Sequence, residues 1–152
     1  MLQRIQTLYL LIAFAITAAL FSMDLAQFAN ETGLFRLTAD GVYTIDADNR
    51  LVMPTHALTI LLVVAELLLL VIIFLYRKRI LQIRLCGMSL GLLIGLSVMI
   101  YYFGKTASKE LGAEHSFSWA MVLPLIAMVF VFLAIKAIGR DEALIRSIDR
   151  IR

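Results

Sequence analysis

Charged side chains, cysteine and proline are all scarce in this sequence, and each scarcity excludes a class of protein. Asp, Glu, Lys and Arg make up 16% of the 152 residues, whereas a soluble domain carries about 25%. The single cysteine, Cys86, excludes an intramolecular disulfide. Two prolines and eight glycines exclude a collagen-like chain. Apolar residues amount to 62%, more than a soluble fold of this length can cover with polar surface. A soluble globular enzyme is therefore excluded.

Four apolar stretches are long enough to cross a membrane. They cover residues 5–23, 55–76, 85–103 and 119–138, and each approaches the roughly 20 residues of a membrane-spanning helix. None alternates as a barrel strand does. Because a helix satisfies its own backbone in lipid, the pattern predicts an all-α fold, an integral membrane four-helix transmembrane bundle, as a single membrane domain over residues 1–152.

The Lys and Arg residues are distributed unequally between the connections. Ten of the fourteen lie in the N-terminal residues, the 77–84 connection and the segment from Lys136 onward. The other connections hold four, together with seven acidic residues. Positive charge is retained on the cytoplasmic side of membrane proteins, so the pattern predicts a multi-pass protein with both termini in the cytoplasm.

The extracytoplasmic connection 24–54 contains a hairpin signal. Two β-capable runs, 34–38 and 42–45, flank Ala39-Asp40-Gly41, which is typical of a short β-hairpin. A lone hairpin is marginal in water. We therefore expect it to pack as a cap over the helices, with a partner-binding edge as the alternative. The connection 104–118 is short and polar, and we expect a structural role.

The cytoplasmic tail, residues 139–152, has the pattern of a C-terminal amphipathic helix. Its apolar positions recur at helical spacing, and Asp141 is placed to cap the helix after a break at Gly139. The pattern favours a helix on the membrane surface or docked to a partner. It does not favour nucleic-acid binding, because no aromatic or base-reading motif accompanies the cations. The tail arginines are Arg140, Arg146, Arg150 and Arg152.

Glu66 is the ionisable residue placed deepest in any predicted span. A charge at mid-bilayer is costly, so the carboxyl is expected to be protonated or paired inside the bundle. One interpretation is a proton relay or a cation-coordinating carboxylate. The favoured one is a neutral acid hydrogen-bonded to a hydroxyl such as that of Thr17 or Ser97.

Three glycines of the third span recur every four residues, at Gly87, Gly91 and Gly95. Such a strip lets another helix backbone approach closely, and packing inside the monomer is favoured over a homodimer seam. His56 and His115 with scattered acids do not make a metal site, which needs three or four placed ligands. No catalytic or cofactor-binding motif occurs.

Three segments carry a resemblance to a known family. They read MLQRIQT at residues 1–7, RILQIRLC at 79–86 and RDEALIRSIDRIR at 140–152. In these segments the chain resembles an uncharacterised bacterial membrane family, catalogued as domain of unknown function 4293. The resemblance implies a small four-span protein of the bacterial inner membrane. It implies no activity and no site residues.

Together these features predict a non-enzymatic inner-membrane protein without a cofactor, an accessory or scaffolding subunit acting through helix packing and its cytoplasmic tail. Its expected partners are the lipid bilayer and either another membrane protein or a second copy of the chain. The alternative is a small proton- or cation-coupled carrier centred on Glu66.

Overall fold

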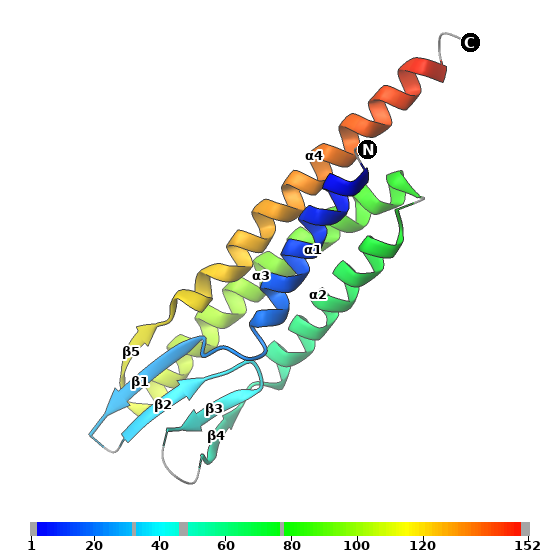
Figure 1. The fold of residues 1–152 in the computed structure, drawn as a ribbon. Helices are drawn as coiled ribbons and strands as arrows, with labels where there is room; N and C mark the ends of the chain where they lie inside the picture. Colours follow the sequence, from blue (N-terminus) through cyan, green and yellow to red (C-terminus); the bar gives the residue numbers. More distant parts are fainter. Residues whose placement is uncertain (1–2, 32, 46–48, 77, 150–152) are drawn as a thin grey trace.

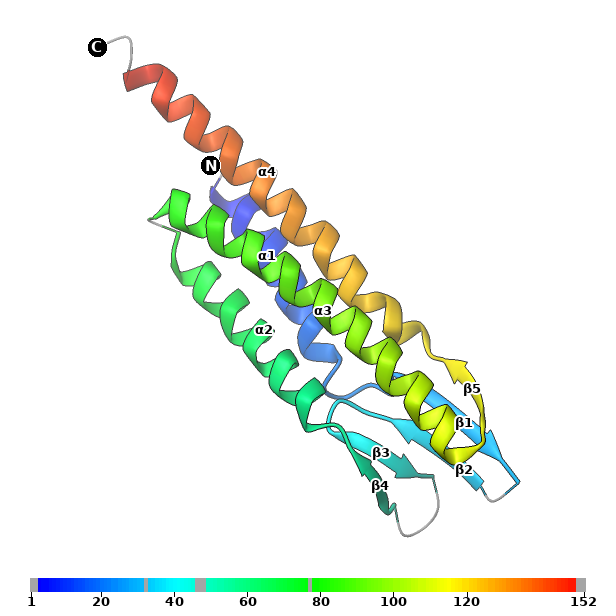
Figure 2. The same ribbon diagram turned by 180° about the vertical axis from the view of Figure 1, so that it is seen from behind.

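The computed structural model describes residues 3–31, 33–45, 49–76 and 78–149, which form a helical bundle with a β-sheet at one end (Figure 1). The helices are α1 (Gln3–Ala19), α2 (His56–Phe74), α3 (Arg79–Leu111) and α4 (Leu123–Asp149). α1 packs mainly against α4, and α3 packs between α4 and α2. α1 begins and α4 ends at the bundle end opposite the sheet (Figures 1 and 2).

Each helix buries one face and leaves large apolar side chains exposed on another. The buried side chains of α2 recur every three or four residues, as in a bundle seam; they are Leu58, Leu62, Ala65, Leu69 and Ile72. On its other face, Ile60, Leu67 and Phe74 are 56–71% exposed. A surface of this kind is costly in water and suits lipid.

Three helical segments are long and apolar enough to cross a membrane: His56–Phe74, Arg79–Leu111 and Trp119–Ala143. They indicate a membrane protein. The apolar part of α1, Ile5–Ala19, is shorter than the predicted span 5–23. After Ala19 the backbone tightens into i→i−3 hydrogen bonds, such as Leu20 N–H to Thr17 O at 3.1 Å, and the chain then leaves the bundle.

α3 is much longer than the predicted span 85–103. It includes part of the basic connection at its start and most of the predicted polar connection 104–118 at its end. Gly104 and Ala107 are buried in this extension, so tertiary packing continues past the apolar run. The helix ends at Gly112, whose φ of 56° is left-handed, a geometry that glycine adopts without strain.

The predicted break at Gly139 and the separate C-terminal helix are wrong, because α4 runs without interruption from Leu123 to Asp149. A single glycine costs a helix only about 1 kcal/mol. Contacts on both sides of Gly139 offset this cost. Gln6 Nε2 donates to the Ala137 carbonyl at 3.2 Å, and Asp141 pairs with Arg79 at 3.3 Å instead of capping a new helix.

The predicted hairpin is confirmed, but it is part of a larger antiparallel sheet. Five strands lie in the order β4-β3-β2-β1-β5, so the fold is mostly helical rather than all-α with a hairpin-like loop. The hairpin pairs β2 with β3, with Leu37 opposite Val42. The fifth strand comes from the second connection, where only a structural link was expected. The strands are β1 (Ala26–Asn30), β2 (Gly33–Leu37), β3 (Gly41–Thr44), β4 (Leu51–Pro54) and β5 (Glu114–Phe117).

The sheet forms a cap on the bundle, as the sequence predicted. One face of its central strands is almost completely buried; the side chains on it are Ala26, Phe28, Phe35, Leu37 and Val42. The turn between β2 and β3 is also held by α2, because the hydroxyls of Thr55 and Thr59 lie 3.3 and 2.9 Å from the Ala39 carbonyl oxygen. The cap is therefore attached to the start of α2.

Candidate functional site

The polar site predicted around Glu66 consists of Glu66 on α2 and Thr17 on α1. Glu66 is the eleventh residue of the nineteen in α2, so it lies near the middle of that helix. Its Oε2 and the Thr17 hydroxyl oxygen are hydrogen-bonded at 2.6 Å, and Thr17 is fully buried. Glu66 Oε1 is buried without a hydrogen-bond partner in the part of the chain that the structure describes. The expected Thr17 contact is confirmed. Ser97 instead bonds to the Leu93 carbonyl at 3.0 Å.

The hydrogen-bond geometry around Thr17 favours a neutral Glu66. The hydroxyl carries one proton, yet the carbonyl oxygens of Ala13 and Phe14 lie 3.1 and 3.0 Å away, in addition to the carboxyl. A protonated Glu66 can donate to the Thr17 oxygen while Thr17 donates to a carbonyl, so that among the described residues only the uncharged Oε1 stays without a partner. An ionised Glu66 would leave a charged oxygen unpaired in apolar surroundings.

The glycine strip does not pack inside the monomer as predicted. A Cβ atom built at Gly87 or Gly91 meets nothing within 4 Å, and both residues are exposed. At Gly95 the nearest atom is Leu61 Cδ2, at 3.8 Å. α3 is rotated about its axis so that Cys86, Ser89 and Leu93 face the bundle instead.

Of the four tail arginines, the structure describes Arg140 and the backbone of Arg146, both on the last turns of α4. Arg140 is exposed on α4. The side chain of Arg146 and the whole of Arg150 and Arg152 lie outside the described residues. The described contact at this end is the ion pair between Arg79 Nη2 and Asp141 Oδ2, whose side chains are 20% and 13% exposed. It ties α4 to the start of α3.

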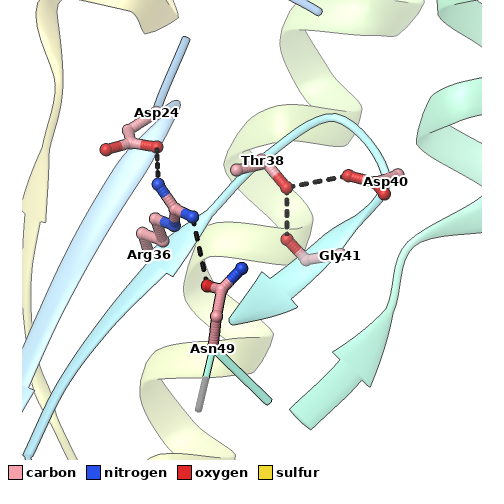
Figure 3. Close-up of polar contacts among 6 residues, drawn as sticks. All are labelled: Asp24, Arg36, Thr38, Asp40, Gly41 and Asn49. Atoms are coloured by element: carbon pink, nitrogen blue, oxygen red, sulfur yellow. Dashed lines mark hydrogen bonds and ion pairs between the residues drawn. The ribbon is translucent and has the colours of Figure 1, made fainter. Parts of the chain in front are cut away.

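Figure 3 shows two groups of polar contacts in the sheet region, one that joins Arg36 to Asp24 and Asn49, and one that joins the Thr38 hydroxyl to Asp40 and the Gly41 carbonyl. The Arg36 guanidinium lies between Asn49 Oδ1, at 3.1 Å, and Asp24 Oδ1, at 3.9 Å. The Tyr43 phenol donates to Asp40 Oδ2 at 2.8 Å, and this bond holds the pKa of the Asp40 carboxyl below its usual value and raises that of Tyr43. The sequence indicated the hairpin turn, but neither the local Tyr43–Asp40 bond nor the contacts of Arg36 with the more distant Asn49 and Asp24.

The two histidines are not part of a metal site that the structure describes. His56 is exposed at the start of α2, and the side chain of His115 lies outside the description. Among the described residues, no three of His, Cys, Asp and Glu are grouped closely enough to hold a metal ion.

The fold and its exposed apolar helices define a helical membrane protein with a β-sheet cap. Residues 2–151 match the family described as Domain of unknown function (DUF4293), and the chain belongs to that family. No curated protein matches the chain. The family description names no activity, so the function has to be argued from the molecule itself.

Proposed function

We propose that this chain is a non-enzymatic membrane protein that serves as a scaffolding or accessory subunit. It acts through helix packing and the tail that continues α4. The observation that carries the proposal is the projection of α4 beyond the ends of the other helices (Figures 1 and 2). A continuous helix fixed at its base by the Arg79–Asp141 pair presents the tail at a defined position. The apolar face that the sequence pattern predicts for the tail would then be a docking surface for a partner.

The proposal includes four membrane spans, with α1 as the shortest, and both termini in the cytoplasm of a bacterial inner membrane. It is supported by the start of α1 and the end of α4 lying at the same end of the bundle. It is also supported by the sequence, which concentrates ten of the fourteen Lys and Arg residues in the N-terminal residues, the 77–84 connection and the segment from Lys136 onward, and seven acidic residues in the other connections. In this proposal the lipid bilayer surrounds the exposed apolar faces of the helices.

Removing residues 144–152 should abolish partner binding without unfolding the protein, because the deletion spares the Arg79–Asp141 pair. We expect an unchanged melting temperature in detergent and at least a tenfold loss of a stoichiometric partner. A photo-crosslinking residue at exposed Ala143 should give a protein adduct of one defined mass. The same residue at Val129, 57% exposed on the same helix, is the matched control and should label lipid. A truncated protein that keeps the full complex contradicts the proposal.

A second candidate function, a proton- or cation-coupled carrier, is favoured by one observation. At mid-helix, Glu66 presents a buried carboxyl oxygen that has no hydrogen-bond partner among the residues the structure describes, and a transported ion could interact there. If Glu66 titrates during transport, the Glu66→Gln substitution removes the titratable group and leaves the shape unchanged.

For the scaffold, we expect Glu66→Gln to be nearly silent, because the amide donates to Thr17 as the neutral acid does. The unfolding free energy should change by less than about 1 kcal/mol, and liposomes containing either protein should show the same proton and sodium flux as empty liposomes. Thr17→Val is the companion variant. It leaves the carboxyl without its partner and should destabilise by about 1–3 kcal/mol. If the wild-type protein carries proton or sodium flux and the Glu66→Gln variant does not, the scaffold function is contradicted and the carrier function is supported.

A further inference from the structure

The corner between α2 and α3 contains a surface pocket of about 290 Å³. The described residues that line it are Phe74, Leu75, Lys78 and Leu81, so an apolar wall is combined with the Lys78 cation. Phe74 is 71% exposed and Leu81 is 41% exposed. The pocket therefore opens onto the same apolar surface that the helices present to lipid.

Hydrogen bonds fix the shape of this corner. The Lys78 backbone N–H donates to the Leu75 carbonyl at 3.0 Å, which closes the turn between the helices. Gln82 is buried on α3, and its Nε2 donates to the Ile72 carbonyl at 3.0 Å, which ties the first turn of α3 to the last turn of α2. A pocket held in this way needs little ordering when a ligand binds.

The electrostatics of the corner favour an anion. Lys78 is exposed, and in the described part of the chain it has no ion-pair partner, whereas its neighbour Arg79 is paired with Asp141. No acidic residue occurs between Glu66 and Glu110. The first turn of α3 has no acidic residue and no side-chain cap, so its N–H groups add partial positive charge.

We propose that this pocket binds an anionic phospholipid, with the phosphate at Lys78 and the first turn of α3 and an acyl chain along Phe74 and Leu81. The occupant is a lipid rather than a free phosphate, because Phe74, Leu75 and Leu81 give the described lining a mainly apolar wall that opens toward the lipid-facing surface. The volume suits a headgroup and the first part of a chain. This inference depends on membrane insertion but not on the scaffold function.

The test measures binding of phosphatidylglycerol to the purified full chain in a neutral detergent, by native mass spectrometry with titrated lipid. Lys78→Gln should weaken binding about five- to tenfold, the effect of one cation at a lipid surface, and Lys78→Arg should restore most of it. Arg84→Gln is the matched control, because it removes the same charge from an exposed position of α3 that does not line the pocket. It should change binding less than twofold.

Three results would overturn the proposal. Equal losses in Lys78→Gln and Arg84→Gln would show general attraction to surface charge. Equal binding of phosphatidylcholine and phosphatidylglycerol would show that the pocket does not recognise the anionic headgroup. Competition by millimolar inorganic phosphate would assign the pocket to a free anion.

Phe74→Ser should weaken lipid binding without changing the melting temperature, and unchanged binding in this variant would contradict the acyl-chain contact.

Discussion

Truncating Phe28 to alanine is expected to destabilise the protein by about 3–5 kcal/mol, because a cavity replaces a large buried ring. Phe28 is 1% exposed and lies on β1, opposite Phe35 of β2 and His115 of β5. Phe28 thus lies where the strands of the connection 24–54 meet β5, the strand that the connection 104–118 contributes. The melting temperature in detergent should fall on the order of 10 °C, and the amides of β1 and β5 should lose protection against hydrogen exchange.

Leu34→Ala is the matched control for this variant. Leu34 lies on β2, paired with Ala29 next to Phe28, but its side chain is 54% exposed on the outer face. Its truncation should change stability by no more than about 0.5 kcal/mol. If Phe28→Ala and Leu34→Ala have the same melting temperature, the sheet is not packed on the bundle, and the cap would have to be a separate surface element.

Replacing Asp141 with alanine is expected to cost about 3 kcal/mol, because it leaves the Arg79 guanidinium mostly buried and without its carboxylate. The side chains of Arg79 and Asp141 are 20% and 13% exposed, and Arg79 Nη1 already lacks a hydrogen-bond partner among the described residues. Because the pair holds α4 beyond Gly139, the variant should also increase hydrogen exchange at residues 137–143.

Two further variants separate the ion pair from a general effect of charge. Arg140→Ala removes an exposed charge next to Asp141 and should be nearly silent. The double variant Arg79→Met with Asp141→Leu replaces the pair by apolar side chains and should recover most of the lost stability. A silent Asp141→Ala would mean that α4 continues past Gly139 without this contact, and the base of the projection would need another explanation.

The local features were predictable because local sequence controls them. The apolar runs indicated α2 and the main part of α4, since only a helix satisfies its own backbone in lipid. The Asp40-Gly41 turn indicated a hairpin, and the structure confirms the antiparallel pairing of β2 with β3. The contact between Glu66 and Thr17 was also anticipated, because a mid-span acid needs a polar partner and few hydroxyls lie at that depth.

The rotation of a helix about its axis could not be predicted in the same way. In α2 most side chains on both faces are apolar, and α3 even buries the polar Gln82 and Ser89, so hydrophobic periodicity does not distinguish the buried face from the exposed one. The expectation that Gly87 and Gly91 face the bundle therefore rested on residue size alone. The structure places Ser89 and Leu93 there instead.

The sequence by itself determined that the chain has membrane-spanning character, that its charge is unequally distributed, and that a hairpin and one polar mid-span site exist. These properties follow from composition and from neighbours within a few residues. Only the tertiary structure decided that β5 completes the sheet and that α4 passes through Gly139. Strand pairing between residues 26–29 and 114–117, and an ion pair between residues 79 and 141, are contacts between distant segments. These contacts outweigh the local tendency of a polar connection to stay irregular and of a glycine to end a helix. Because the contacting residues are far apart in the sequence, local patterns do not reveal them.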